Sequence, residues 1–175
     1  MTSRAQTPFQ PGEVQTRKGR SLTLRTYSAE DFEALVKMYV GFEPKRIAQG
    51  LPPPDAVRTV RWLEELQRNS EALLAFDGQK IVAHTILCPI DPEEVEFTIF
   101  VLQGYREEGL GTGLSKATLE WARAMKFRRV LLTTELSNYR AVRLFRKIGF
   151  RIKSSYGDEC EMKLDLSAES EAQAA

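Results

Sequence analysis

The sequence has few of the residues from which disulfide frameworks and metal sites are built. Its 175 residues include two cysteines and one histidine. Cys88 and Cys160 both lie in apolar runs, a usage that suits a reducing compartment. We therefore expect neither a disulfide framework nor a metal.

A large net charge and long apolar runs are also absent. Twenty-five Lys and Arg residues face 24 Asp and Glu residues, which leaves a formal net charge of +1. This near balance gives no support for a general nucleic-acid or membrane surface. No run of about 18 apolar residues could form a transmembrane helix, and the first twenty residues lack the apolar stretch of a signal peptide. These absences predict a cytoplasmic protein.

The length fits one domain with a hydrophobic core of its own. Residues 1–20 are polar, basic and aperiodic, which predicts a flexible N-terminal arm. Residues 167–175 form a similar short tail, so the predicted domain spans residues 21–166.

Hydrophobic periodicity and turn residues predict the element order β-α-α-β-β-β-α-β-α-β-β. The predicted strands are 21–27, 71–76, 80–89, 95–102, 129–134, 150–154 and 160–166, and the predicted helices are one from Ser28, then 55–66, 110–127 and 138–148. A mixed sheet with helices on its faces, an α/β fold, is the natural packing for this order.

The most informative segment is residues 96–113, where a strand runs into a glycine-spaced turn that opens a helix. Backbone N–H groups at a helix start are unpaired, and Gly109 and Gly111 would let an anion approach them closely. This pattern indicates a pyrophosphate held by the amides of residues 107–112. An ordinary strand-to-helix turn would also explain it. A dinucleotide-binding motif requires a third glycine at the position of Leu114. Glu135 does lie near the expected distance of about 20 residues at which that motif has an acidic residue.

Two motifs in this region resemble those of the GCN5-related N-acetyltransferases, the GNAT family. The run from Arg106 to Gly111 is similar to the family's R/Q-x-x-G-x-G/A signature, and Asn138-x-x-Ala141-x-x-Leu144-Phe145-x-x-x-Gly149-Phe150 is similar to its N-x-x-A-x-x-L-Y-x-x-x-G-F helix motif. The resemblance implies a mostly antiparallel mixed sheet and transfer of an acetyl group from acetyl-CoA to a primary amine by direct attack.

The resemblance also assigns expected roles in coenzyme binding. It places the pyrophosphate on Arg106, Glu107, Glu108, Gly109, Leu110, Gly111 and Thr112, the pantetheine arm on the backbone of Ile99, Phe100 and Val101, and Asn138 near the thiol. The basic residues between Arg123 and Lys153 would attract the phosphates, or else form a solvated surface.

For catalysis, transfer to an amine needs a base that takes a proton from the ammonium form. Glu96 is the predicted base, because partial burial on the strand before the turn would raise its pKa. His84 is expected to be a structural residue rather than the base, and Cys88 is a weaker candidate as an acyl-carrying nucleophile. The family often has a tyrosine as general acid where this chain has Phe145, whose ring cannot donate a proton. Another group or a water molecule would then have to protonate the leaving thiolate, or catalysis would rely on positioning alone.

The family builds its acceptor site from the first two helices and their connection, which here is residues 39–54. Tyr39 and Phe42 are the predicted substrate-contacting residues, with Arg46 and Gln49 in the same connection. Acidic residues near Glu93 would favour a cationic acceptor. The sequence leaves the acceptor open, along with the choice between monomer and homodimer. The chief alternative function is a non-catalytic acyl-CoA-binding regulatory module of the same fold.

Overall fold

The computed structural model describes residues 8–44 and 52–167. They form one eight-stranded sheet in the order β1-β2-β3-β4-β5-β6-β8-β7. The strands are β1 (Gly12–Gln15), β2 (Ser21–Thr26), β3 (Glu71–Asp77), β4 (Lys80–Pro89), β5 (Glu94–Val101), β6 (Arg129–Glu135), β7 (Arg151–Tyr156) and β8 (Glu159–Asp165). The helices are α1 (Phe32–Val40), α2 (Ala56–Asn69), α3 (Leu110–Ala124) and α4 (Tyr139–Lys147).

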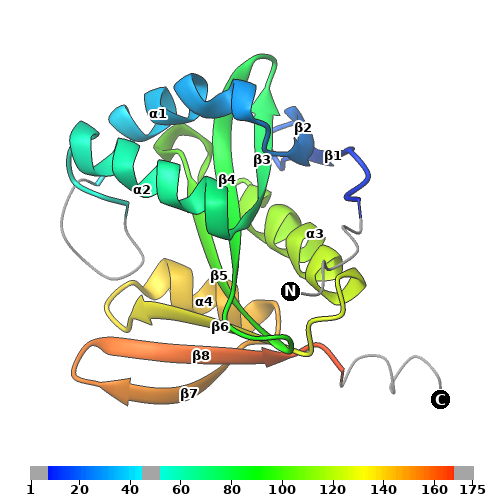
Figure 1. The fold of residues 1–175 in the computed structure, drawn as a ribbon, viewed down its shortest axis with the longest axis vertical. Coiled ribbons are helices and arrows are strands. Elements are labelled where there is room, and N and C mark those ends of the chain that lie inside the picture. The colour runs from blue at the N-terminus through cyan, green and yellow to red at the C-terminus, as the bar shows by residue number, and fades with distance from the viewer. Residues whose placement is uncertain (1–7, 45–51, 168–175) are drawn as a thin grey trace.

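Every neighbouring pair of strands is antiparallel except β5 and β6, which are parallel. This confirms the predicted mixed, mostly antiparallel sheet. In Figure 1, β3 and β4 run nearly vertically, whereas β7 and β8 run nearly horizontally. The sheet therefore turns sharply between its two halves, and the turn falls at β5 and β6.

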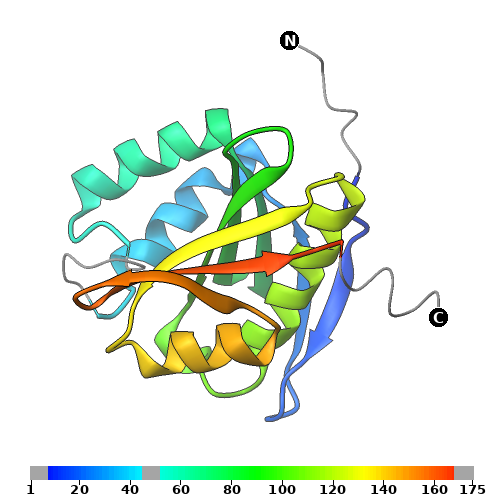
Figure 2. The same cartoon turned by 90° about the horizontal axis from the view of Figure 1, so that it is seen from below.

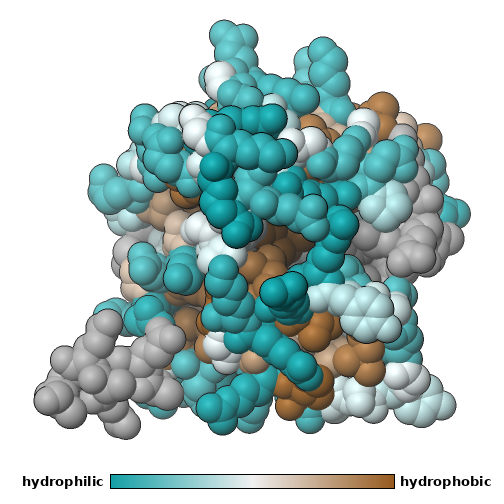
Figure 3. Space-filling view, turned by 180° about the vertical axis from the view of Figure 1, so that it is seen from behind, coloured by the Kyte–Doolittle hydropathy of each residue, from teal (hydrophilic) through white to brown (hydrophobic). Residues whose placement is uncertain are grey.

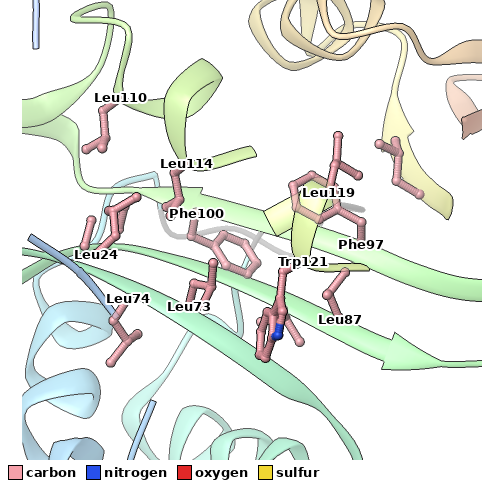
Figure 4. Close-up of a cluster of buried hydrophobic side chains, with 14 of the residues drawn as sticks. Leu24, Leu73, Leu74, Leu87, Phe97, Phe100, Leu110, Leu114, Leu119 and Trp121 are labelled. Atoms are coloured by element: carbon pink, nitrogen blue, oxygen red, sulfur yellow. The ribbon is translucent and has the colours of Figure 1, made fainter. Parts of the chain in front are cut away.

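Helices cover both faces of the sheet, with α1 and α2 on one side and α3 and α4 on the other (Figure 2). β5 carries aromatic residues toward each face. Phe100 packs edge-on against Tyr39 of α1 and Trp62 of α2. Phe97 points to the other face and packs against Phe145 of α4. On that second face α3 supplies Leu110, Leu114 and other buried side chains, which lie over Leu73 of β3 and Leu87 of β4 (Figure 4). Residues at odd positions of β5 thus face α3 and α4, and those at even positions face α1 and α2.

The amino-terminal segment differs from its predicted form. Residues 12–15 were expected in a flexible arm, but they form β1, whose Val14 pairs with Leu22 of β2. A Cβ added to Gly113 would lie 3.1 Å from Val14 Cγ1, so β1 packs closely on α3. The sequence prediction is wrong for this strand because a mostly exposed four-residue edge strand shows almost no periodicity.

Local signals at the helix starts behave as the sequence predicts. The Ser28 amide donates to Asp31 Oδ2 at 2.8 Å, and a short 3-10 turn precedes α1. At the start of α2, Asp55 Oδ1 accepts from the Arg58 amide at 2.8 Å. Each carboxylate satisfies an amide that the first helical turn leaves unpaired. No helix within the described ranges is long and apolar enough to cross a membrane.

Candidate functional site

The parallel strands β5 and β6 pair over only three positions. The last pair joins Glu96 to Leu131, yet β5 continues to Val101 and β6 continues to Glu135. Beyond Glu96 the facing edge of β5 is therefore not paired with β6. An unpaired strand edge offers a row of backbone donors and acceptors to a ligand.

The hydrogen-bond pattern determines which residues of β5 face this split. Leu102 donates its amide to Val82 O at 2.9 Å, so even-numbered residues bond to β4 and odd-numbered residues point away from it. Ile99 thus turns both its N–H and its C=O toward the split. Val101 turns its N–H there, but its carbonyl oxygen accepts from Arg106 Nε at 2.8 Å. Phe100 does not face the split, because its backbone belongs to the β4 ladder and its side chain is buried. The prediction for Phe100 is corrected accordingly.

The glycine-spaced turn leads directly from this strand into α3. Gly109 precedes the helix with φ at +86°, a left-handed conformation that glycine adopts without strain. The first bond of the helix runs from the Gly113 amide to Gly109 O at 3.1 Å. The amides of Leu110, Gly111 and Thr112 therefore lie before the first intrahelical donor, at the positive end of the helix dipole. This arrangement fits an anion.

Glu108 lies beneath the turn with its side chain fully buried. Neither of its carboxylate oxygens accepts a hydrogen bond within the described residues. Its charge is met by two cations from the β1–β2 connection: Lys18 Nζ lies 3.2 Å from Oε1 and Arg20 Nε lies 3.8 Å from Oε2. The Glu108 side chain is therefore a structural group, and only its backbone remains available to a phosphate.

The side chain of Arg106, the first residue of the glycine-spaced motif, bonds to the end of β5 and to the residues after α1. Its Nε donates to Val101 O at 2.8 Å, its Nη2 donates to Glu43 O at 2.5 Å, and its guanidinium lies 5.0 Å from the Phe42 ring centroid. Burial, with a smaller effect from Arg140, lowers the pKa of Arg106. Its observed contacts tie the end of β5 to the residues after α1, and differ from the phosphate contact expected from the sequence.

Gln103 makes a second tie of the same kind. Its side-chain Nε2 donates to Gly41 O at 2.6 Å, and its Oε1 accepts from the Glu43 amide at 3.1 Å. The start of the connection between α1 and α2 is thus fixed to the turn before α3. Sequence reasoning missed both ties, because each joins segments that lie 60 to 63 residues apart in the chain.

Tyr39 and Phe42, the predicted acceptor-contacting residues, belong to the core. Each is 3% exposed, and both pack against Phe100. In this arrangement their side chains support the connection from beneath and do not line an open pocket. Arg46 and Gln49, named for the same site, lie outside the described residues.

His84 shares this aromatic cluster as a structural residue. Complete burial lowers the pKa of His84 to about 3, so its ring is neutral at physiological pH. Burial also raises the pKa of Tyr39, whose hydroxyl forms a hydrogen bond of 2.7 Å with His84 Nδ1. A satisfied, neutral imidazole agrees with the structural role that the sequence favours for it.

The buried His84 makes a testable contribution to acid sensitivity. Its pKa is lower in the folded state than in the unfolded chain, so stability is present above pH 6.5 and is lost as pH falls. Between pH 7.5 and 5.0 the free energy of unfolding of the wild type should fall by about 2 kcal/mol more than that of His84→Gln, which keeps an acceptor for Tyr39. Urea titrations at both pH values measure this. Equal losses in the two proteins would mean that His84 is protonated in the fold.

Glu96 lies at the last paired position before the split, on the face of α1 and α2. Its side chain is exposed, so the partial burial expected from the sequence is not found. The thiol of Cys88, its cross-strand neighbour, has a pKa raised by burial and by the charge of Glu96. Glu96 forms no ion pair within the described part of the chain. Its carboxylate therefore stands accessible at the mouth of the split.

The other acidic residues of this region are used by the fold. Glu93 lies 3.5 Å from Arg128 Nη1, and Glu94 Oε1 lies 2.7 Å from Arg129 Nε. Asp91 Oδ1 accepts the amides of both Glu93 and Glu94 at 2.7 Å. Glu96 is thus left as the carboxylate that could attract a cationic acceptor here.

Two predicted residues of α4 have clear structural duties. Asn138 Oδ1 accepts from the Ala141 amide at 3.4 Å as the cap of α4, which leaves its Nδ2 for a ligand. Phe145 is 6% exposed and packs against Phe97 and Phe150. The ring therefore fills the core beside the strand that forms one side of the split.

A cavity of about 240 Å³ lies on the same face as Glu96. Its lining includes Leu63 of α2, His84 of β4, and Tyr27, Ser70 and Glu71. Burial raises the pKa of Glu71, and the Tyr27 hydroxyl has no hydrogen-bond partner within the described residues. Figure 3 shows a second hollow, on the face turned away in Figure 1, where apolar residues are ringed by hydrophilic ones. Among the described residues no group of His, Cys, Asp and Glu could hold a metal ion.

Comparison with known families identifies the family to which this chain belongs. The family model described as the acetyltransferase (GNAT) family matches residues 32–150, which include the split, the turn and the start of α4. The chain belongs to the GNAT acetyltransferase family, whose members use acetyl-CoA.

Individual relatives are more distant. A mycothiol acetyltransferase of Corynebacterium glutamicum is 32% identical over 90 residues, which cover 51% of this chain and 31% of that relative. The match thus takes in less than a third of the relative's length. The GNAT domain of PAT from S. lividans superposes with a TM-score of 0.77 at 18% identity, over 89% of this chain and 96% of that one.

A putative acetyltransferase from Salmonella typhimurium, solved with its cofactor acetyl-CoA, has a TM-score of 0.65 at 17% identity. The alignment covers 83% of this chain and 94% of that one. At these identities the structural neighbours establish the fold.

Proposed function

We propose that this chain transfers an acetyl group from acetyl-CoA to a primary amine. The observation that carries the proposal is the split between β5 and β6, which ends at the glycine-spaced start of α3. A strand edge that is not paired with a neighbouring strand suits the amide-bearing pantetheine arm, and the helix start beyond it suits a pyrophosphate.

The residues at the turn fit this coenzyme. The amides of Leu110, Gly111 and Thr112 are available donors, and Gly109 adopts its φ of +86° without strain. The peptide N–H and C=O of Ile99 and the N–H of Val101 would hold the pantetheine arm, with Nδ2 of Asn138 as a further donor. The coenzyme supplies a thioester, an acyl group activated for attack by an amine.

The chain's own contribution to chemistry lies on the other side of the split. Glu96 would accept a proton from the ammonium form of the acceptor, so that a neutral amine forms the amide bond as the C–S bond breaks and the thiol leaves. The accessible carboxylate of Glu96 would also favour a cationic acceptor. The connection between α1 and α2, whose start at Gly41 and Glu43 is bonded to Gln103 and Arg106, would form the acceptor side of the site.

Acetyl-CoA binding and turnover over an amine panel test the proposal. Calorimetry with acetyl-CoA and with NAD should give binding of the first alone, and release of free thiol should accompany acetylation of at least one primary amine. Binding without turnover over the whole panel would favour the non-catalytic module. Binding of NAD alone would favour the dinucleotide site and overturn the proposal.

Phe145→Tyr tests whether the family's usual tyrosine can be restored. Phe145 packs beside β5 at the split, so a hydroxyl on its ring should reach the leaving thiolate and raise turnover by about threefold or more. The acetyl-CoA affinity should stay unchanged. Steady-state rates and thermal midpoints are measured for both proteins. A lower rate in a folded Phe145→Tyr variant would mean that another donor already acts there.

A further inference from the structure

The connection between β1 and β2, residues Thr16 to Arg20, docks onto the turn before α3. We call it the basic turn, because it carries Arg17, Lys18 and Arg20. The Thr16 amide donates to Arg20 O at 2.9 Å and the Gly19 amide donates to Thr16 O at 2.9 Å, so its backbone is well fixed. This segment precedes residues 32–150, the part that matches the family model.

The basic turn contacts residues 104–108, which lead into the start of α3. The Arg17 amide donates to Glu108 O at 2.8 Å, and Arg17 Nη2 donates to Glu107 O at 3.1 Å. Arg20 Nη1 donates to Gly104 O at 3.3 Å, and its guanidinium lies 4.3 Å from the Tyr105 ring centroid. These contacts hold the basic turn against the start of α3 from the side of β1.

Arg17 lies directly beside the residue that begins α3. A Cβ added to Gly109 would lie 3.8 Å from Arg17 Nε. The Arg17 side chain is exposed, and its bond to Glu107 O uses one of five guanidinium N–H groups. The remaining donors are available to a ligand at the helix start.

The charges around this helix start leave a positive excess. Arg140 Nη2 of α4 lies 3.4 Å from Glu107 Oε1, and Lys18 and Arg20 face the carboxylate of Glu108. Four cations thus surround two carboxylates, at the end of a helix whose dipole is itself positive. Such an arrangement is electrostatically unfavourable until an anion joins it.

From these contacts we infer that the basic turn is part of the coenzyme site. Arg17 binds a phosphate group of coenzyme A, while Lys18 and Arg20 neutralise the buried Glu108 that would otherwise repel that phosphate. The inference rests on the proposed function and adds a binding residue from outside the matched family region. The phosphate is either the pyrophosphate or the 3′-phosphate of the coenzyme.

Arg17→Gln tests this with binding as the readout. The substitution keeps the backbone bond to Glu108 and removes the charge, so the dissociation constant for coenzyme A should rise about tenfold at low salt. The difference should shrink as salt is raised, because screening weakens the charge contact in the wild type. Arg17→Lys should recover part of the affinity. Arg61→Gln, on the exposed face of α2, is the matched control and should bind as the wild type does.

Calorimetry with 3′-dephospho-coenzyme A distinguishes the two phosphates. If Arg17 holds the 3′-phosphate, wild type and Arg17→Gln should bind this analogue equally; a persisting tenfold difference assigns Arg17 to the pyrophosphate. Equal binding of coenzyme A itself by folded wild type, Arg17→Gln and Arg61→Gln would overturn the inference and leave the proposed function standing. Failure of the wild type to bind coenzyme A would instead overturn the proposed function.

Discussion

Replacing Gly111 with valine should weaken acetyl-CoA binding by about a hundredfold, since two or more charge-assisted hydrogen bonds, each worth about 1.5–3 kcal/mol, depend on the first turn of α3. A Cβ at this position would lie 3.4 Å from Leu144 Cδ2 and 3.9 Å from Val101 Cγ2. The two methyl groups of valine would therefore press on α4 and on the end of β5. Both the helix start and the strand edge of the split would have to move.

Two further glycine variants separate this effect from a general loss of stability. Gly111→Ala places only the Cβ at ordinary contact distance, so it should bind acetyl-CoA within about threefold of the wild type. Gly104→Val makes the same change in the turn before α3, where a Cβ meets nothing within 4 Å, and should bind normally. Calorimetry and thermal midpoints are measured for all three variants. Near-normal affinity in a folded Gly111→Val protein would contradict the assignment of the phosphate to this turn.

The sequence motif does not distinguish the roles of Gly109 and Gly111. Sequence reasoning identifies the glycine spacing and the exposed amides that follow from it. It assumes that both glycines clear the path of the phosphate. In the structure Gly109 supplies the left-handed conformation beside Arg17, whereas Gly111 allows close packing of α3 against Val101 and Leu144. The two glycines therefore serve different needs, and only tertiary contacts distinguish them.

The fold itself could be predicted largely from local signals. Capping carboxylates at Asp31 and Asp55, the turn at Gly78 and the ending of α4 before Gly149 all lie where the sequence indicates. Each signal acts within a few residues of the structure that it specifies. β1 escaped prediction because its four residues alternate weakly, although Gly19 between Val14 and Leu22 is the kind of turn signal that marks a short hairpin.

The site could be predicted only in part, because many of its contacts are long-range. The backbone roles proposed for Ile99 and Val101 come from the resemblance of this strand and turn to the GNAT motifs. The exclusion of Phe100 requires the register between β4 and β5, and the contacts of Arg106 with Glu43 O require the position of the α1–α2 connection. The basic turn looks like a disordered polar tail until β1 pairs with β2. Charge-bearing segments far apart in the sequence meet only in the folded chain.

Glu96→Gln should lower kcat/KM at neutral pH by about a hundredfold or more, the usual contribution of a positioned general base. Glu96 is accessible at the last paired position before the split, and glutamine keeps its shape while removing its charge. Acetyl-CoA affinity should barely change, because no coenzyme contact is assigned to this side chain. Activity should partly recover toward pH 10, where more of the acceptor amine is already deprotonated and needs no base.

Glu94→Gln is the matched control for this experiment. Glu94 shares the face of β5 two residues earlier, but its carboxylate is paired with Arg129 Nε at 2.7 Å. Its replacement should leave kcat/KM and the pH profile unchanged, with at most a small loss of stability from a partly exposed ion pair. The three proteins are compared by kcat/KM from pH 6 to 10 with one amine acceptor. If the Glu96→Gln profile runs parallel to that of the wild type, the proton leaves the amine by another route, such as a water molecule held by the peptide groups of the split.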